Sequence, residues 1–227
     1  MTSFDDLTHD AFLGGKLQLL QPKDGYRAGV DPVFLAATVN AKEGETVLDL
    51  GCGVGAAALC LGTRIPSLKL TGVERQPEYA VLARKNGLET VCADLENLPD
   101  EIRQQQFHHV LANPPYYDRT ASVAARNTGR EGALGEDTPL SAWMKAAAKR
   151  LKPRGHVHVI HRAERLVDLL SALPKVLGSV QVLPLAPRVG RKAELVILRA
   201  KKDGRAAFEL LSPCILHLGD RHERDGD

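Results

Sequence analysis

Short apolar runs alternate with segments of helical periodicity through the middle of the chain. The apolar runs predict buried strands over residues 46–50, 70–73, 90–93, 110–112 and 157–160. Apolar positions three and four residues apart predict helices over residues 56–61, 78–85, 140–151 and 163–173. Two more strands are expected at 180–183 and 195–199. This alternation predicts the α/β class, with a mostly parallel sheet and helices on both of its faces.

The two ends of the chain lack this alternation. A strand is expected over residues 16–21, followed by a turn at Pro22-Lys23-Asp24-Gly25 and a helix that Asp31 could cap. We interpret residues 1–40 as a lid or platform, 41–212 as the main domain, and 213–227 as a tail. Residues 117–139 carry Gly, Pro, Thr and Arg without periodicity, and a connection of that length is usually functional.

Composition narrows the function classes. A length of 227 residues and a hydrophobic content of 44% are sufficient for a folded domain with a buried core. The net charge of +2 is too small for nucleic-acid binding by overall charge alone. No apolar run approaches the length of a membrane span, and the first residues do not resemble a signal peptide, so we expect a cytoplasmic protein. The cysteines lack metal-ligand spacing and are interpreted as small buried hydrophobes: Cys52, Cys60, Cys92 and Cys214.

A glycine loop follows the strand at 46–50 and reads Asp-Leu-Gly-Cys-Gly-Val-Gly. Gly51, Gly53 and Gly55 let the backbone approach a ligand, and the next helix offers free N–H groups to a carboxylate. Loops of this kind also hold NAD. The G-x-G-x-G spacing and the carboxylate of Asp49 favour the cationic cofactor S-adenosylmethionine (SAM) over a pyrophosphate. Cys52 lies within the loop and is included in the predicted cofactor site.

Two acidic residues end the next two predicted strands. Glu74 stands where such folds place an acid against a ribose diol, although a solvated carboxylate at a strand end is an alternative. Asp94 could accept the amino group of the cofactor's adenine. A cap ahead of Leu95 and Glu96 explains Asp94 equally well.

A second motif, Asn113-Pro114-Pro115-Tyr116, follows the strand at 110–112. A planar amine is a poor nucleophile because its lone pair is delocalised. The side-chain oxygen of Asn113 and the carbonyl of Pro114 could accept its hydrogens and favour a reactive geometry, while Pro115 stiffens the loop and Tyr116 offers a ring for stacking. Catalysis would then rest mostly on positioning. The alternative is a turn that contains Asn-Pro-Pro by accident.

Together these motifs resemble the class I SAM-dependent methyltransferases of the N-P-P-Y type, and more closely the bacterial adenine-N6 methyltransferases of valine tRNA. The resemblance rests on residues 49–55, 72–74 (Gly-Val-Glu) and 113–117 (Asn-Pro-Pro-Tyr-Tyr), with further similarity at 26–31 and 125–128. It implies a seven-stranded, mostly parallel Rossmann-like sheet with one antiparallel strand near the end. The stretch between the two acidic strand ends is short, which predicts an abbreviated second helix.

The resemblance also implies roles outside the two central motifs. Arg27, Gly29 and Asp31 become candidate contacts for the methionine end of the cofactor, although turn and cap chemistry explains Asp31 about as well. The candidate substrate contacts follow the second motif: Tyr117, Arg119, Arg126 and Arg130.

Several later residues admit a structural explanation. A second basic cluster contains Arg188, Arg191 and Lys192, and a third contains Arg199, Lys201, Lys202 and Arg205. Solvated surface charge accounts for both clusters at least as well as RNA binding does. His156 and His158 share one face of a predicted strand, where packing is favoured over metal binding, and Trp143 is interpreted as a core anchor.

The leading hypothesis is a SAM-dependent N-methyltransferase that modifies adenine N6 in RNA, with tRNA as the favoured partner. The target base would leave its stack and lie between Asn113 and Tyr116. Alternatives are a protein glutamine N-methyltransferase, another RNA or DNA base methyltransferase, and a non-catalytic SAM- and RNA-binding module. The complete Asn-Pro-Pro-Tyr motif argues against the last. Neither a metal nor a membrane is expected to take part, and the sequence does not indicate an oligomeric state.

Overall fold

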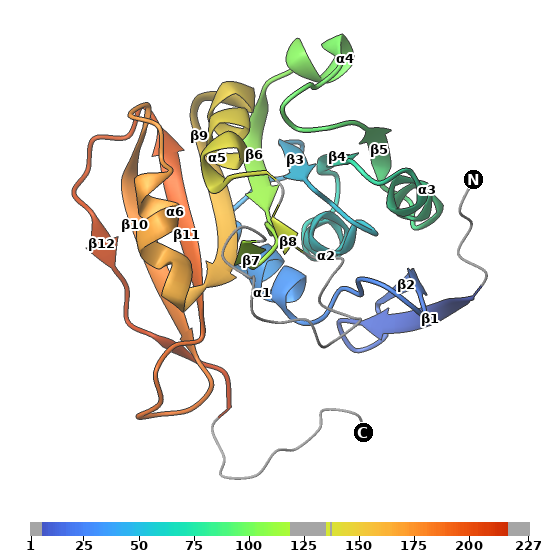
Figure 1. The fold of residues 1–227 in the computed structure, drawn as a ribbon, viewed down its shortest axis with the longest axis horizontal. Coiled ribbons are helices and arrows are strands. Elements are labelled where there is room, and N and C mark those ends of the chain that lie inside the picture. The colour runs from blue at the N-terminus through green and yellow to red at the C-terminus, as the bar shows by residue number, and fades with distance from the viewer. Residues whose placement is uncertain (1–5, 119–134, 137, 218–227) are drawn as a thin grey trace.

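The computed structural model describes residues 6–118, 135–136 and 138–217. A twisted sheet crosses the molecule with helices on both faces, and a separate N-terminal hairpin lies beyond one side (Figure 1). This arrangement confirms the α/β class and the mostly parallel sheet. No helix in the described part of the chain is long and apolar enough to cross a membrane.

The central sheet has the strand order β12-β10-β11-β9-β6-β3-β4-β5, and β13 also pairs with β10. Its main strands are β3 (Thr46–Leu50), β4 (Lys69–Glu74), β5 (Glu89–Cys92), β6 (Phe107–Ala112), β9 (Leu151–Arg162), β10 (Leu177–Ala186) and β11 (Leu195–Lys202). All seven were expected from the sequence. β11 runs antiparallel to both of its neighbours, as the family resemblance implies, while the pairs formed by β9, β6, β3, β4 and β5 are parallel.

Two short strands extend the sheet beyond the seven that the sequence predicts. β12 (Glu209–Leu210) and β13 (Cys214–Ile215) each contain two residues and pair with β10. Two residues are too few to produce a period, so the hydrophobic pattern could not reveal them. As a result, the first residues of the segment interpreted as a tail are paired with the sheet.

The helices fall into two groups. α1 (Asp31–Thr38), α2 (Ala56–Arg64) and α3 (Pro77–Lys85) lie on one face, whereas α4 (Asp100–Arg103), α5 (Leu140–Arg150) and α6 (Leu166–Ser171) lie on the other. The predicted helix at 163–173 divides into a 3-10 turn, Ala163–Arg165, and α6. The expectation of an abbreviated second helix was wrong, because α2 and α3 both contain nine residues.

The N-terminal segment forms a hairpin of β1 (Leu7–Phe12) and β2 (Leu17–Pro22) ahead of α1. The expected cap on α1 was wrong. Val30 occupies the cap position without a side-chain hydrogen bond, and Asp31 is the first helical residue. The carboxylate of Asp31 instead accepts a hydrogen bond from the hydroxyl of Tyr116, a partner far along the chain.

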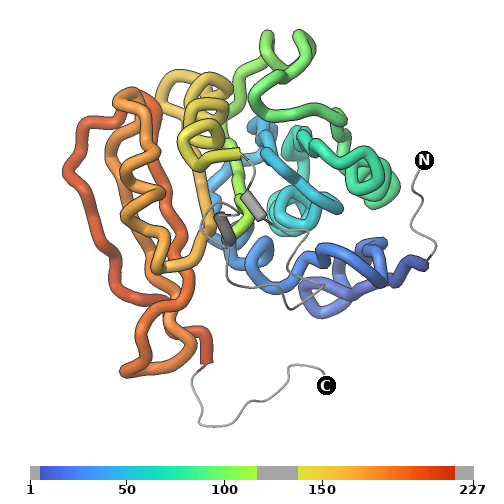
Figure 2. The backbone as a smooth tube through the Cα atoms, viewed as in Figure 1, coloured from blue at the N-terminus to red at the C-terminus, as the bar shows by residue number. Residues whose placement is uncertain are grey.

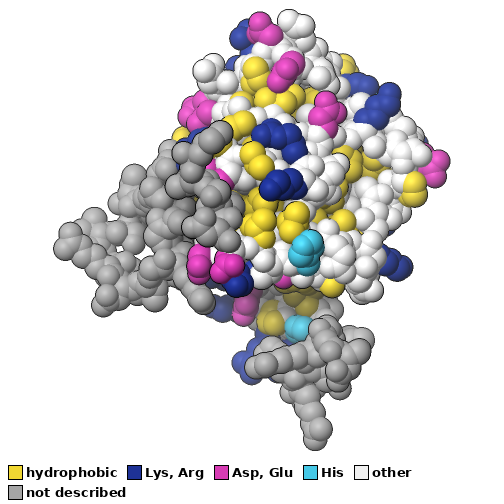
Figure 3. All heavy atoms as spheres, turned by 90° about the vertical axis from the view of Figure 1, so that its right-hand side faces the viewer, with side chains coloured by type: hydrophobic (Ala, Val, Ile, Leu, Met, Phe, Trp, Pro, Cys, Tyr) yellow, Lys and Arg dark blue, Asp and Glu magenta, His cyan; other side chains and the backbone are white. Residues whose placement is uncertain are grey.

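The cysteines are not all buried, which corrects the interpretation from sequence. Cys52 and Cys60 are buried, whereas Cys92 and Cys214 are exposed. Cys92 ends β5, an edge strand, and Cys214 lies in the short strand β13, so neither has sheet on both sides. The face over α3, β5 and the hairpin carries acidic and basic side chains scattered among uncharged ones (Figure 3).

A histidine cluster lies on the sheet face that α1 and α2 share. His109 Nδ1 is 3.1 Å from His158 Nε2, and His109 Nε2 is 3.0 Å from a carboxylate oxygen of Glu45. The ring of His156 stacks on that of His109 with 5.9 Å between centroids. Among the described residues, no group of three or more His, Cys, Asp or Glu side chains is arranged to hold a metal ion.

Burial makes these histidines difficult to protonate. It lowers the pKa of His158 well below the ordinary value and that of His156 to about 4, with nearby Arg199 adding to the second effect. Burial also lowers the pKa of His161, which is fully buried near the end of β9, to about 4.

The free energy of unfolding should therefore fall as the pH falls from about 6.5 towards 4. In this window the histidines of the unfolded chain take up protons that the folded protein excludes. Each histidine whose pKa lies below the window lowers the free energy of unfolding by about 1.4 kcal/mol per pH unit. Urea unfolding at pH 7, 6 and 5 measures the slope. Because carboxylates also titrate below pH 5, the decisive comparison is His156→Gln, which should show a shallower slope than the parent; equal slopes would contradict the assignment.

Candidate active site

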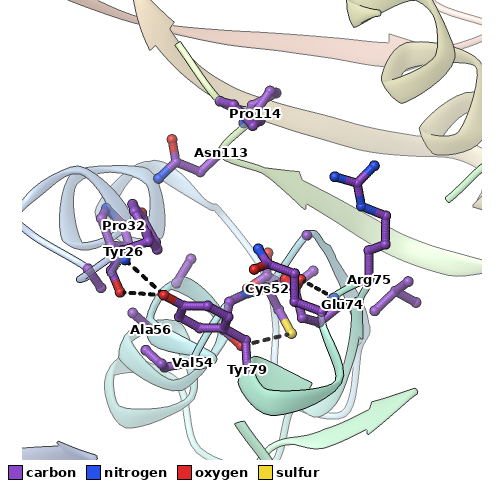
Figure 4. A pocket seen from close by; sticks show the side chains of 18 of the residues that line it. Tyr26, Pro32, Cys52, Val54, Ala56, Glu74, Arg75, Tyr79, Asn113 and Pro114 are labelled. Carbon is purple, nitrogen blue, oxygen red and sulfur yellow. Dashed lines mark hydrogen bonds between the residues drawn. The ribbon is translucent and has the colours of Figure 1, made fainter. Parts of the chain in front are cut away.

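A cavity of about 510 Å³ opens at the carboxyl ends of β3, β4 and β6. Parallel strands bring their carboxyl ends to one edge, and ligands of open α/β sheets bind there. Figure 4 shows side chains from three places around this space: Glu74 from the end of β4, Tyr79 from α3, and Asn113 from the end of β6. The predicted cofactor residues that line the cavity are Arg27, Gly29, Asp31, Asp49, Gly51, Cys52, Gly53, Glu74, Asp94 and Asn113. Gly55 does not line it.

The glycine loop needs its glycines for two different reasons. Gly51 has φ +64°, and a Cβ at this position would overlap the indole ring of Trp143. Gly55 has φ +90° at the cap of α2, where its N–H donates to the carbonyl of Cys52 at 2.8 Å. Side chains at these positions would strain the backbone or displace Trp143. The loop therefore presents bare backbone to the cavity, which is the condition for a ligand to approach closely.

Glu74 is fixed by two backbone donors. The N–H of Gly53 donates to one carboxylate oxygen at 2.9 Å, and the N–H of Gln76 donates to the other at 2.8 Å. Burial raises the pKa of Glu74, and these N–H bonds oppose the rise by stabilising the charged form. Each oxygen keeps further acceptor capacity, so the carboxylate can bind a pair of hydroxyl groups without moving.

Asp49 is 2% exposed and accepts one hydrogen bond, from the N–H of Ala58 at 3.2 Å. Burial raises its pKa to about 7, and the charge of Glu74 adds to the effect. Near neutral pH this carboxyl group is poised between its two protonation states. A cation in the cavity would favour the charged state.

Two tyrosines form a wall that the sequence did not assign to the site. The Tyr79 hydroxyl donates to the carbonyl of Tyr26 at 3.1 Å and accepts from the N–H of Tyr26 at 2.8 Å, which ties α3 to the segment before α1 (Figure 4). Burial raises the pKa of Tyr26 to about 12. Tyr26 belongs to the motif at 26–31 and could have been included on that signal. Tyr79 had no local signal, because it reaches the site across 53 positions.

Arg27 and Asp94 line the cavity but are also engaged elsewhere. The Arg27 guanidinium donates to Thr8 Oγ1 at 2.9 Å and pairs with Asp10 at 2.5 Å, so the N-terminal hairpin holds its charge. Asp94 Oδ1 accepts a hydrogen bond from the N–H of Glu96 at 2.9 Å, which is a turn contact and not the helix cap considered as the alternative from sequence, because α4 begins only at Asp100. The second carboxylate oxygen of Asp94 can still accept a hydrogen bond from the amino group of the cofactor's adenine.

The Asn-Pro-Pro-Tyr segment follows β6 directly. Within the described part of the chain, the side-chain amide of Asn113 has no hydrogen-bond partner, and Pro114 beside it is buried. The Tyr116 ring lies 5.3 Å from the ring of His161, and the guanidinium of Arg162 lies 5.9 Å from its centroid. The loop is thus packed from behind, while its amide remains available to a ligand.

The predicted substrate contacts are only partly described. Tyr117 begins β7 (Tyr117–Asp118), which pairs with β8 (Gly135–Glu136). Arg119, Arg126 and Arg130 lie outside the described residues. Trp143, interpreted as a core anchor, is buried in the core and also lines the cavity through its contact with the glycine loop.

The donor set fits SAM. A loop without side chains, a carboxylate that can take two hydroxyls, and a buried acid that gains from a nearby cation all face one cavity. The Asn113 amide, which has no partner among the described residues, lines the same cavity and can accept hydrogen bonds from an amine.

Comparison with known proteins agrees with this chemistry. The sequence model of a family described as "Methyltransferase small domain" matches residues 28–187. A tRNA1(Val) (adenine(37)-N6)-methyltransferase from Porphyromonas gingivalis is 29% identical over 70% of this chain and 68% of that protein. A protein of the same name from Actinobacillus succinogenes is 28% identical over 78% of this chain and 77% of its own length. For the one from Haemophilus influenzae, the aligned part is 60% of the relative.

Solved structures share the fold. A predicted O-methyltransferase from Agrobacterium tumefaciens superposes with a TM-score of 0.70 at 24% identity, over 85% of this chain and 90% of that one. A Thermus thermophilus 16S rRNA N2 G1207 methyltransferase, in complex with AdoMet and guanosine, gives a TM-score of 0.60 at 22% identity, over 90% of this chain and 47% of that one. At these identities the likeness shows the class I methyltransferase fold.

The affinity for SAM should fall as the pH falls, because the cationic ligand favours ionised Asp49. With a pKa of about 7, the affinity should drop about fivefold between pH 7 and pH 6, and binding at pH 7 should release about half a proton. Calorimetry in two buffers of different ionisation enthalpy measures both quantities. The control is Asp49→Asn, which should bind more weakly with a flatter pH profile. A parent profile identical to that of the variant would mean that Asp49 does not pair with the ligand.

Proposed function

Because the chain belongs to the methyltransferase small domain family and is a SAM-dependent methyltransferase, we propose that it methylates the N6 of an adenine in tRNA. The observation that carries the proposal is the Asn113 amide, which lines the cavity beside the glycine loop and has no partner in the described part of the chain. The names of the relatives support the choice of adenine and of tRNA. With tRNA as the substrate, we propose the cytoplasm as the place of the reaction.

Different residues of the cavity would bind different parts of the cofactor. Glu74 would accept hydrogen bonds from the ribose hydroxyls, and Asp49 would face the positive charge of the methionine end. The free N–H groups at the start of α2 would donate hydrogen bonds to the methionine carboxylate. When bound, SAM supplies a methyl group already activated by the sulfonium. The protein therefore has to position the acceptor and does not need to activate the donor.

The acceptor amine would lie between the Asn113 side-chain oxygen and the Pro114 carbonyl. Two acceptors on its hydrogens orient the lone pair towards the methyl group. Tyr116 would stack on the base, and its own orientation is fixed by the hydrogen bond to Asp31. His161 behind this ring stays neutral at physiological pH, because burial lowers its pKa to about 4, so it adds no charge to the clamp. The amine proton leaves to solvent after the attack.

Asn113→Ala should lower methyl transfer to tRNA by about two to three orders of magnitude, the usual cost of removing one preorganised polar group that acts in the transition state. The affinity for SAM should change little. The matched variant Asn113→Asp retains acceptor oxygens at this position and should keep more activity than the alanine variant. Labelled SAM, unmodified tRNA and nucleoside analysis for N6-methyladenosine measure transfer, and calorimetry measures cofactor binding.

Three results would contradict the proposal in different ways. Simultaneous loss of SAM binding and transfer would make Asn113 structural or cofactor-facing. Label in a protein extract, with none in RNA, would move the reaction to glutamine. Binding of SAM and RNA without any transfer would favour a non-catalytic module.

A further inference from the structure

A second cavity, of about 650 Å³, lies beside the first. The two share Val30, Asp31 and Tyr116 in their walls. The remaining wall comes from Phe34 of α1, from Arg162 at the end of β9, from the turn between β10 and β11 with Leu195 at the start of β11, and from residues 216–217. That turn extends past the neighbouring strands on the side of α1, as the orange hairpin in Figure 2 shows.

The side chains around this second cavity are unevenly charged. Its basic residues are Arg162, Arg188, Arg191 and Lys192, and its acidic residues are Asp31 and Glu194. The Asp31 carboxylate already accepts the Tyr116 hydroxyl, which reduces its capacity to pair with the arginines. The second cavity is therefore net positive, in contrast to the mixed charge of the face in Figure 3.

The turn places three cations in the lining of the second cavity. Arg188 Nε is buried and has no hydrogen-bond partner among the described residues, which costs free energy unless a ligand or water supplies an acceptor. Arg191 and Lys192 are exposed next to it. The lining also contains apolar side chains, among them Phe34 and Leu195. Cations facing an apolar surface suit a phosphate joined to a sugar or base.

We propose that the second cavity binds the phosphodiester and nucleoside that adjoin the target adenine in the RNA strand, with Arg188, Arg191 and Lys192 as phosphate contacts. This inference rests on the proposed function. Tyr116 lines both cavities, so a base stacked on Tyr116 in the first cavity would bring its adjoining phosphate towards the second. The guanidinium of Arg162, which lines the second cavity, lies 5.9 Å from the centroid of the same ring.

The test reverses charge in the turn and at a distant control position. R191E/K192E replaces two exposed cations of the cavity. K175E/R205E makes the same charge change at two exposed positions by the opposite end of the β10–β11 hairpin, where Leu177 pairs with Lys202. Equilibrium binding of unmodified tRNA is measured against salt concentration. Methyl transfer and SAM affinity are measured on the same preparations.

R191E/K192E should bind tRNA at least about tenfold more weakly, with a salt slope reduced by about 1.4 for two lost single-strand contacts. The KM for tRNA should rise more than kcat falls, and SAM affinity should stay within about twofold of the parent. K175E/R205E should match the parent in all three measurements.

Failure of this inference is distinguishable from failure of the proposed function. If the parent methylates tRNA and both double variants bind tRNA as tightly as the parent does, the second cavity is not a phosphate site. Equal losses in both double variants would show general electrostatic attraction and would also overturn it. If the parent neither binds nor methylates tRNA but labels protein, the proposed function fails and this inference with it.

Discussion

Two backbone N–H groups on one buried carboxylate hold the site together. Glu74 joins the glycine loop at Gly53 to the start of α3 at Gln76, so two parts of the wall of the cavity at the carboxyl ends of β3, β4 and β6 are tied together. The arrangement has an electrostatic cost, because Asp49 is buried close by with one N–H donor and the charge of Glu74 raises its pKa. A site built in this way is complementary to a ligand that brings positive charge and hydroxyl groups together.

Tyr116 lies between the cofactor cavity and the elements that hold the Asn-Pro-Pro-Tyr loop in place. Its hydroxyl reaches Asp31 at the start of α1, its ring rests against His161 of β9, and its carbonyl accepts from Arg165 at 3.4 Å. Side chains from the start of α1 and from the end of β9 with the turn that follows it, all distant from Tyr116 in the sequence, therefore set the position of one loop. A loop fixed from three sides loses little conformational entropy when the acceptor binds, which is the physical content of preorganisation.

The sequence predicted what depends on local pattern. The strands that carry Asp49 and Glu74, and the one that precedes Asn113, have short β-rich apolar stretches, and the glycine loop and the Asn-Pro-Pro-Tyr motif are contiguous, so each could be recognised in place. The contacts that complete the site are not local. Tyr79 meets Tyr26 across 53 positions and Tyr116 meets Asp31 across 85, and no period or spacing encodes such pairs. The expected cap at Asp31 failed for this reason, because tertiary contact with Tyr116 took the carboxylate that the local rule assigned to the backbone.

The clamp alone cannot select its substrate. The side-chain amide of glutamine and the amino group of adenine are both planar, and both present hydrogens that Asn113 and Pro114 can accept. Discrimination must come from groups that the two substrates do not share, and a nucleotide always carries a phosphate close to its base. The cations of the second cavity, which Tyr116 also lines, can bind this phosphate, and a glutamine side chain has no such group. Because Tyr116 forms a wall of both cavities, binding free energy gained at the phosphate can be used to orient the base at Asn113, so substrate choice and catalytic rate are linked through one side chain.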